Sequence, residues 1–249
     1  MFMSFWQLFL TNFRMLYRNW RGLFFNIFLP VFLYLAISKI SGNAPGSNTI
    51  TYSEYLLPGI IAMTIMQTGI FSLAYWLVDL KARGVIKRLL VTPLSNFEML
   101  GSLIASRLVL MAIQIGLIIS IGVWYFNTSI PGSGLAILLL MIMGCAVFLG
   151  IGFAVSSFAK TYEEAAPITT ILNLLFTFLG NIFFPTNNLP VVLKTIASKL
   201  PITYLAEGMR NNFVQEWTLK QTLPDLLGLG VWLVIVAVIL RYTTKLKQD

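Results

Sequence analysis

The chain has 249 residues, of which 57% are hydrophobic and only 10% are charged, and its net charge is +8. Soluble domains keep roughly a quarter of their residues charged, so this composition excludes an ordinary soluble domain and an intrinsically disordered chain. The basic residues lie between apolar runs rather than on one aromatic-rich face, which argues against nucleic-acid binding. The sequence therefore predicts an all-α membrane protein, with residues 1–249 forming a single transmembrane domain.

Residues 1–21 have the pattern of an amphipathic helix. Aromatic and apolar side chains recur at helical spacing, opposite Arg14, Arg18 and Arg21. These basic residues follow the apolar ones, and no small-residue cleavage site is present, so the pattern is not typical of a signal peptide. We expect a retained interfacial helix that lies in the membrane surface ahead of the first span.

Six apolar segments are candidates for membrane-spanning helices. The uncharged run from Leu108 to Ala159 is too long for one span of about 20 residues, and the turn-forming stretch 127–134 divides it into two. The last segment has the shortest uncharged core, from Leu226 to Leu240. The expected spans are residues 22–40, 56–79, 99–125, 134–158, 165–184 and 223–242.

The distribution of lysine and arginine predicts the orientation of these spans. Connections rich in Lys and Arg stay on the cytoplasmic side of a membrane. With a cytoplasmic N-terminus, that side receives the basic residues of 1–21, those of the 79–98 connection, Lys160 and the basic C-terminal tail. We therefore expect a multi-pass protein of the plasma (inner) membrane with both termini in the cytoplasm.

Residue types that carry chemistry are scarce. The chain has no histidine, and no Asp, Glu, Lys or Arg lies at the centre of an expected span, where ion-coupled carriers usually place functional charges. The only acidic pair, Glu163-Glu164, precedes Pro167 and is typical of a solvated helix start. A Gly-x-x-x-x-Gly-Lys-Ser/Thr nucleotide loop is absent. We expect no catalytic, cofactor-binding or metal site here, and any energy for transport would come from a partner protein.

The connection between the second and third expected spans, residues 79–98, has the pattern of a short amphipathic helix. Val85, Ile86, Leu89 and Leu90 form an apolar stripe beside basic residues, and Pro93 ends the helix. This pattern alone is equally consistent with an interfacial helix held by anionic lipid.

Residues 84–95 of this connection read Gly-Val-Ile-Lys-Arg-Leu-Leu-Val-Thr-Pro-Leu-Ser. The stretch resembles the segment between spans two and three of the type-2 ATP-binding cassette (ABC) transporter permeases, especially their drug-export branch. Tyr55-Leu56-Leu57-Pro58-Gly59-Ile60 is similar to the entry of that family's second span. The stretch from Phe183 to Arg210 is similar to its outer hairpin before span six. Together with the six-span plan, the resemblance covers nearly the whole chain.

The resemblance implies that this connection is a coupling helix that docks on an ATPase subunit. Many relatives carry a glutamate where this chain has Ala82, and Asp79 or Glu98 could substitute for it. The implied ATPase-coupling segment comprises Lys81, Arg83, Gly84, Lys87, Arg88, Leu89, Pro93, Leu94 and Ser95.

The resemblance also implies a function. It suggests the permease subunit of an ABC exporter that moves an amphipathic substrate (a drug, an antibiotic or a lipid-like molecule) outward. ATP and Mg would bind to a separate ATPase subunit, so this chain would not itself be an enzyme. Its partners would be that ATPase, a second copy of the chain or a paralogous permease, and membrane lipid, but no nucleic acid. Three alternatives remain open: a self-contained ion-coupled carrier, a membrane-embedded lipid-processing enzyme, and a non-transporting assembly factor.

Polar residues recur at helical spacing within the second and fifth expected spans. They could line a substrate path, or they could only form hydrogen bonds between helices. The candidate translocation surface comprises Thr64, Gln67, Thr68, Thr170, Asn173 and Thr177. The outer segment 185–224 is too polar for another span, and we expect short re-entrant helices there.

Overall fold

The computed structural model describes residues 2–40, 50–85, 96–183 and 190–245, and in this part of the chain all secondary-structure elements are helices. This confirms the predicted all-α class. The elements are α1 (Phe2–Arg18), α2 (Trp20–Ile40), α3 (Tyr52–Gln67), the π-helical turn η1 (Thr68–Ser72), α4 (Leu73–Ala82), α6 (Asn96–Phe126), α7 (Gly134–Phe158), α8 (Tyr162–Leu179), α9 (Val191–Ala197), α10 (Pro201–Val214) and α11 (Leu219–Lys245).

Five helices within the described ranges are long and apolar enough to cross a membrane. They are Trp20–Ile40, Tyr52–Ala82, Glu98–Phe126, Gly134–Phe158 and Leu219–Tyr242. The expected span 165–184 falls largely on α8, which has 18 residues. At 1.5 Å per residue this helix is about 27 Å long, slightly less than the roughly 30 Å hydrocarbon core. A sixth crossing therefore stays a prediction.

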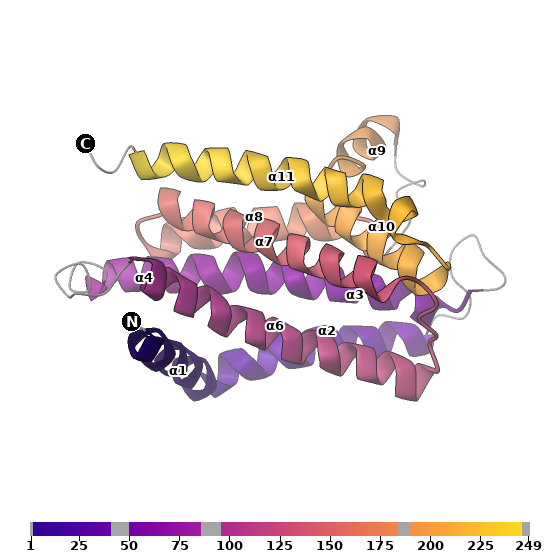
Figure 1. Ribbon diagram of the computed structural model, residues 1–249, viewed down its shortest axis with the longest axis horizontal. Helices are drawn as coiled ribbons and strands as arrows, with labels where there is room; N and C mark the ends of the chain where they lie inside the picture. Colours follow the sequence, from indigo (N-terminus) through magenta and orange to yellow (C-terminus); the bar gives the residue numbers. More distant parts are fainter. Residues whose placement is uncertain (1, 41–49, 86–95, 184–189, 246–249) are drawn as a thin grey trace.

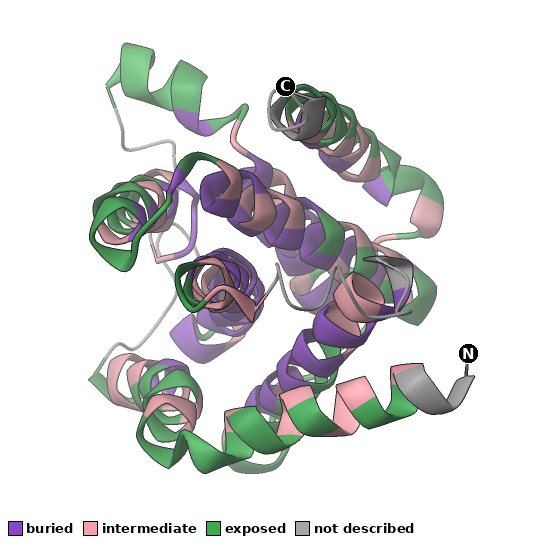
Figure 2. Cartoon of the chain, turned by 90° about the vertical axis from the view of Figure 1, so that its left-hand side faces the viewer, coloured by how far each residue is buried: buried purple, intermediate pink, exposed green. Residues whose placement is uncertain are grey.

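The long helices run side by side, and α1 lies across one end of them. Figure 1 shows α2, α3, α6, α7, α8 and α11 running lengthwise, with α1 seen nearly end-on, and in Figure 2 α1 runs across the view. Asn12 of α1 donates from Nδ2 to Ser102 Oγ of α6 at 3.4 Å. This crosswise direction is the one expected of a helix in the membrane surface, and the interfacial position of α1 stays a prediction.

Both described ends of the chain lie at the same end of the bundle. The start of α1, the end of α11 and the end of α4 are together on the left of Figure 1, and α9 and α10 lie at the other end. The start of α1, the end of α4 and the end of α11, which adjoin segments that we expect to be cytoplasmic, therefore share one side of the molecule.

The helix formed by α3, η1 and α4 is the centre of the bundle. In its most apolar stretch 83% of the residues are buried, compared with 17% in α2 and 17% in α11. Leu56, Leu57, Ile60 and Ile61 of α3 are fully buried. Hydropathy does not distinguish such a central helix from its neighbours, because lipid and protein interior are equally apolar.

A pair of glycines brings α7 close to this central helix. A Cβ atom added to Gly152 would lie 2.4 Å from the carbonyl oxygen of Gly69, and one added to Gly69 would lie 2.7 Å from Cβ of Phe148. Gly69 lies within η1, and π-helical turns often mark functional sites. The absence of side chains at both positions allows the two backbones to approach.

We expect Gly152→Ala to destabilise the protein by about 1–3 kcal/mol, since the new methyl group overlaps a backbone carbonyl that cannot move freely. Unfolding in a denaturing-detergent titration would measure the loss. Gly116→Ala is the matched control, because nothing lies within 4 Å of its added Cβ. Equal stability of the two variants would contradict the close crossing.

Candidate functional site

The last turn of α4 begins the predicted ATPase-coupling segment. The amide of Gly84 donates to the carbonyl of Lys81 at 3.0 Å, and Gly84 has a φ of +67°, the left-handed conformation that commonly ends a helix. Arg83 is exposed and donates from Nε to Asp79 Oδ1 at 2.8 Å. This turn ends α4 at the end of the bundle that carries both termini.

Lys81 attaches the start of this segment to a second helix. Its Nζ donates to the carbonyl oxygen of Ser156 in the last turns of α7. Carbonyls near a helix C-terminus carry partial negative charge and lack intrahelical donors, so a lysine suits this position. The other predicted members of the segment, Lys87, Arg88, Leu89, Pro93, Leu94 and Ser95, lie outside the described residues.

The two acidic residues near Ala82 differ in accessibility. Asp79 is exposed and forms the ion pair with Arg83. Glu98 is only 6% exposed, so its carboxylate is not at the surface. Of these two carboxylates, Asp79 is the one at the surface.

The polar residues of the central helix face into the chain. Thr64 is buried and donates to the carbonyl of Ile60 at 2.8 Å. Thr68 is also buried and donates to Gln114 Oε1 at 3.1 Å, and Gln114 Nε2 donates to the carbonyl of Asn26 at 3.0 Å. This relay joins η1, α6 and α2. Gln67 is half-buried.

The polar residues of α8 lie nearer the surface of the chain. Thr170 is exposed, and the half-buried Thr177 donates to Asn173 Oδ1 at 3.3 Å. Thr169, one residue away, is buried and shares a 2.8 Å hydrogen bond with the Tyr75 hydroxyl of α4. Large exposed apolar side chains flank these three polar residues. They are Ile171, Leu174, Leu175 and Phe178.

A buried arginine organises the opposite end of the bundle. Arg210 of α10 is 9% exposed. Its Nη2 donates to the carbonyls of Asn181 and Ile182 at 2.7 and 3.3 Å, and its Nε donates to the carbonyl of Tyr55 at 3.2 Å. Its guanidinium carbon also lies 3.9 Å from the centroid of the Tyr55 ring, a cation–π contact. Arg210 thus connects α10 to the start of α3 and the end of α8.

Side-chain hydrogen bonds extend this cluster. The Tyr55 hydroxyl donates to Asn181 Oδ1 at 3.0 Å, and Asn181 Nδ2 donates to Glu207 Oε1 at 2.6 Å. Asn181 has a φ of 54°, a conformation that asparagine tolerates better than most residues. Burial lowers the pKa of the Arg210 guanidinium, while the Tyr55 and Glu207 side chains oppose the shift.

The cluster brings together two of the stretches that resemble the permease family. Tyr55 and Gly59 belong to the first, and a Cβ on Gly59 would lie 2.5 Å from the carbonyl of Ile182. Arg210 ends the second. Sequence reasoning placed Arg210 in an outer connection and missed its burial. The spacing of Glu207 and Arg210, three residues apart on one helix face, was the available signal.

Arg107 was also missed as a buried charge. It is 3% exposed within α6, and its guanidinium carbon lies 5.0 Å from the Trp76 ring centroid of α4. Within the described ranges, no group of three or more His, Cys, Asp or Glu residues could hold a metal ion.

Comparison of the sequence with known proteins identifies relatives of this chain. The sequence model for the ABC-2 type transporter family matches residues 3–214. The inner membrane transport permease YadH of Escherichia coli (strain K12) is 23% identical over 190 residues, which are 74% of this chain and 74% of YadH. The probable multidrug ABC transporter permease YbhR of the same strain is 20% identical over 187 residues, 75% of this chain and 50% of YbhR.

We expect Arg210→Leu to lower the free energy of unfolding by about 3 kcal/mol or more, since it leaves buried carbonyls without a donor. Tyr55→Phe keeps the ring under the guanidinium and loses one hydroxyl bond, so it should cost only about 1 kcal/mol. Denaturing-detergent titrations would rank the variants, with the exposed Lys220→Leu as control. If Arg210→Leu and Lys220→Leu were equally stable, the structural role of Arg210 would be refuted.

Proposed function

The chain belongs to the ABC-2 type transporter family, and on this premise we propose that it is the membrane-spanning permease subunit of an ABC exporter. The substrate is amphipathic, a drug, an antibiotic or a lipid-like molecule, and moves outward across the plasma (inner) membrane. A separate ATPase subunit binds ATP and Mg and hydrolyses the nucleotide.

The family match is the observation that carries this proposal. It extends from α1 to the end of α10 and includes the connection between α4 and α6. Two relatives support the details, since YadH is named an inner membrane transport permease and YbhR a probable multidrug ABC transporter permease. The name of YadH agrees with transport in the inner membrane, and that of YbhR agrees with a drug as substrate.

The end of the bundle that carries both termini is the proposed cytoplasmic, ATPase-facing end. Arg83 is exposed there, Lys81 connects the last turn of α4 to α7, and Gly84 ends α4 in a left-handed conformation. The connection that follows supplies Lys87 and Arg88. The excess of basic residues at this end supports a cytoplasmic orientation.

The exposed face of α8 is the proposed contact with a second permease copy. On this face, Thr170, Asn173 and Thr177 are flanked by large apolar side chains. The polar groups would lack hydrogen-bond partners in lipid, and the apolar groups would be unfavourable in water. Two such faces across a dimer would enclose a path with both polar and apolar walls. An amphipathic substrate requires both.

ATP dependence tests the function. Vesicles that contain the permease and its ATPase should export a fluorescent amphipathic substrate only when ATP is present.

Charge reversal at Lys87 and Arg88 should reduce transport-coupled ATP hydrolysis severalfold, whereas Lys220→Glu at the other end should not. A cysteine at Leu89, in a chain with Cys145 replaced, should crosslink to the ATPase. Transport that persists without any nucleotide-binding partner would overturn the proposal.

Crosslinking also tests the contact between copies. With Cys145 replaced, we expect Leu174→Cys to form a disulfide between two copies, because Leu174 is 55% exposed on the proposed face of α8. Val234→Cys on α11 is the control, since it is 64% exposed on another helix. Crosslinked dimer would be measured on non-reducing gels. Dimer from Val234→Cys alone would place the contact on α11 instead.

A further inference from the structure

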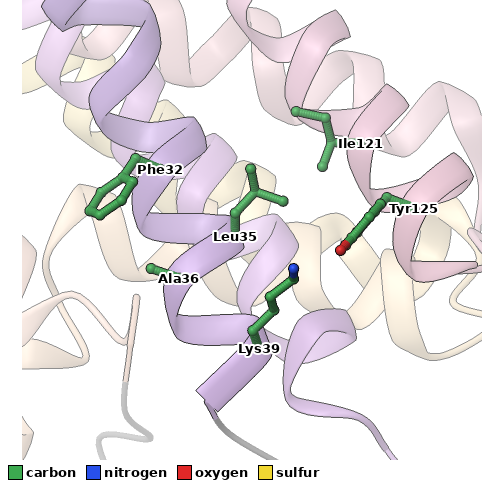
Figure 3. A pocket seen from close by; sticks show the side chains of 6 residues that line it. All are labelled: Phe32, Leu35, Ala36, Lys39, Ile121 and Tyr125. Atoms are coloured by element: carbon green, nitrogen blue, oxygen red, sulfur yellow. The ribbon is translucent and has the colours of Figure 1, made fainter.

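A cleft opens between α2 and α6 at the end of the bundle opposite the termini. Its volume is about 440 Å³. The lining residues come from the last turns of both helices and are Phe32, Leu35, Ala36, Lys39, Ile121 and Tyr125. In Figure 3, Leu35 and Lys39 point from α2 toward Ile121 and Tyr125 of α6, while Phe32 and Ala36 lie on the other side of α2 in this view.

The cleft combines an apolar wall with one cation. Four of its lining side chains are hydrocarbon, and the polar atoms at its mouth are Lys39 Nζ and the Tyr125 hydroxyl. The ammonium lies 5.3 Å from the centroid of the Tyr125 ring, and Figure 3 shows the lysine pointing toward this tyrosine. The cation therefore lies beside the Tyr125 ring at one edge of the cleft.

Within the described part of the chain, Lys39 forms no ion pair with a carboxylate, whereas Arg83 pairs with Asp79. The sequence from Lys39 to Ser53 contains no acidic residue. Glu54 accepts from the backbone amide of Thr51 at 2.9 Å. The acidic residue of α6, Glu98, lies in the first turn of that helix, at its other end. The cleft thus has a net positive charge that an anion would complement.

The position of the cleft relative to the membrane identifies the kind of anion. Lys39 and Tyr125 are each the penultimate residue of a span helix, the level at which lysine and tyrosine meet lipid headgroups. Trp124 beside them is 83% exposed. Phe32 lies seven residues deeper, which is about 10 Å along the helix. A ligand that fits has an anionic group at the surface and a hydrocarbon chain below it.

We propose that the cleft of Lys39, Tyr125, Phe32, Ala36 and Ile121 binds one anionic phospholipid from the leaflet opposite the chain termini. The phosphate pairs with the Lys39 ammonium, and an acyl chain lies against Phe32, Ala36 and Ile121. A zwitterionic lipid binds less well, because its own cation would meet a site that has no acid.

Native mass spectrometry of the purified protein titrated with phosphatidylglycerol or phosphatidylcholine tests the site. Wild type should bind phosphatidylglycerol more tightly. Lys39→Gln should weaken phosphatidylglycerol binding about fivefold, the effect of one basic residue near a membrane surface, and weaken phosphatidylcholine binding less, because the choline cation already offsets the phosphate charge. Lys220→Gln, another exposed lysine, should bind like wild type. Equal binding of phosphatidylglycerol by Lys39→Gln and Lys220→Gln would overturn the proposal.

Ala36→Trp tests the hydrocarbon half of the site and keeps the charge. It should weaken both lipids by filling the cleft. Glycerol phosphate, which has the anion without acyl chains, should not compete. If Ala36→Trp instead dissociated a dimer and left lipid binding intact, the cleft would be a contact between copies and the lipid site would be refuted.

Discussion

The contacts of Arg210 with three backbone carbonyls are the interaction on which the end of the bundle opposite the termini depends. The last carbonyls of a helix have no intrahelical donor, and hydrocarbon offers none. Arg210 supplies donors to Asn181 and Ile182 beyond α8 and to Tyr55 at the start of α3. Its planar fork can serve several acceptors at once, which a lysine cannot do. One buried guanidinium thus holds three segments that are far apart in the sequence.

In the remainder of the bundle, the central helix is largely buried and the helices at the edge are largely exposed. The α3–η1–α4 helix is almost enclosed by its neighbours, while α2 and α11 leave most of their side chains uncovered. Apolar side chains gain nothing by choosing protein over lipid, so close contact is found where small residues permit it, as at Gly69 and Gly152. The uncovered faces remain available to lipid or to another subunit, as expected for one part of a larger transporter.

Much of this could be predicted from sequence, and the exceptions have a common cause. The expected spans 22–40 and 99–125 lie within α2 and α6, because apolar runs bounded by charges or turn residues define helices. The sequence pattern also identified the polar residues of the second and fifth expected spans, but it did not show whether they face another helix or the surface of the chain. Thr64 and Thr68 face neighbouring helices, whereas Thr170 is exposed. Helical periodicity gives the face of a helix and not what that face meets.

The sequence by itself determined the membrane environment, the helical class and the family, since each follows from composition or from a local order of residues. The tertiary structure decided which charges are buried and which are free. Arg210 and Lys39 both lie at the end of the bundle opposite the termini, yet Arg210 is enclosed by three carbonyls and a tyrosine ring, whereas Lys39 lines a cleft. That difference comes from packing between distant segments, which no local pattern encodes.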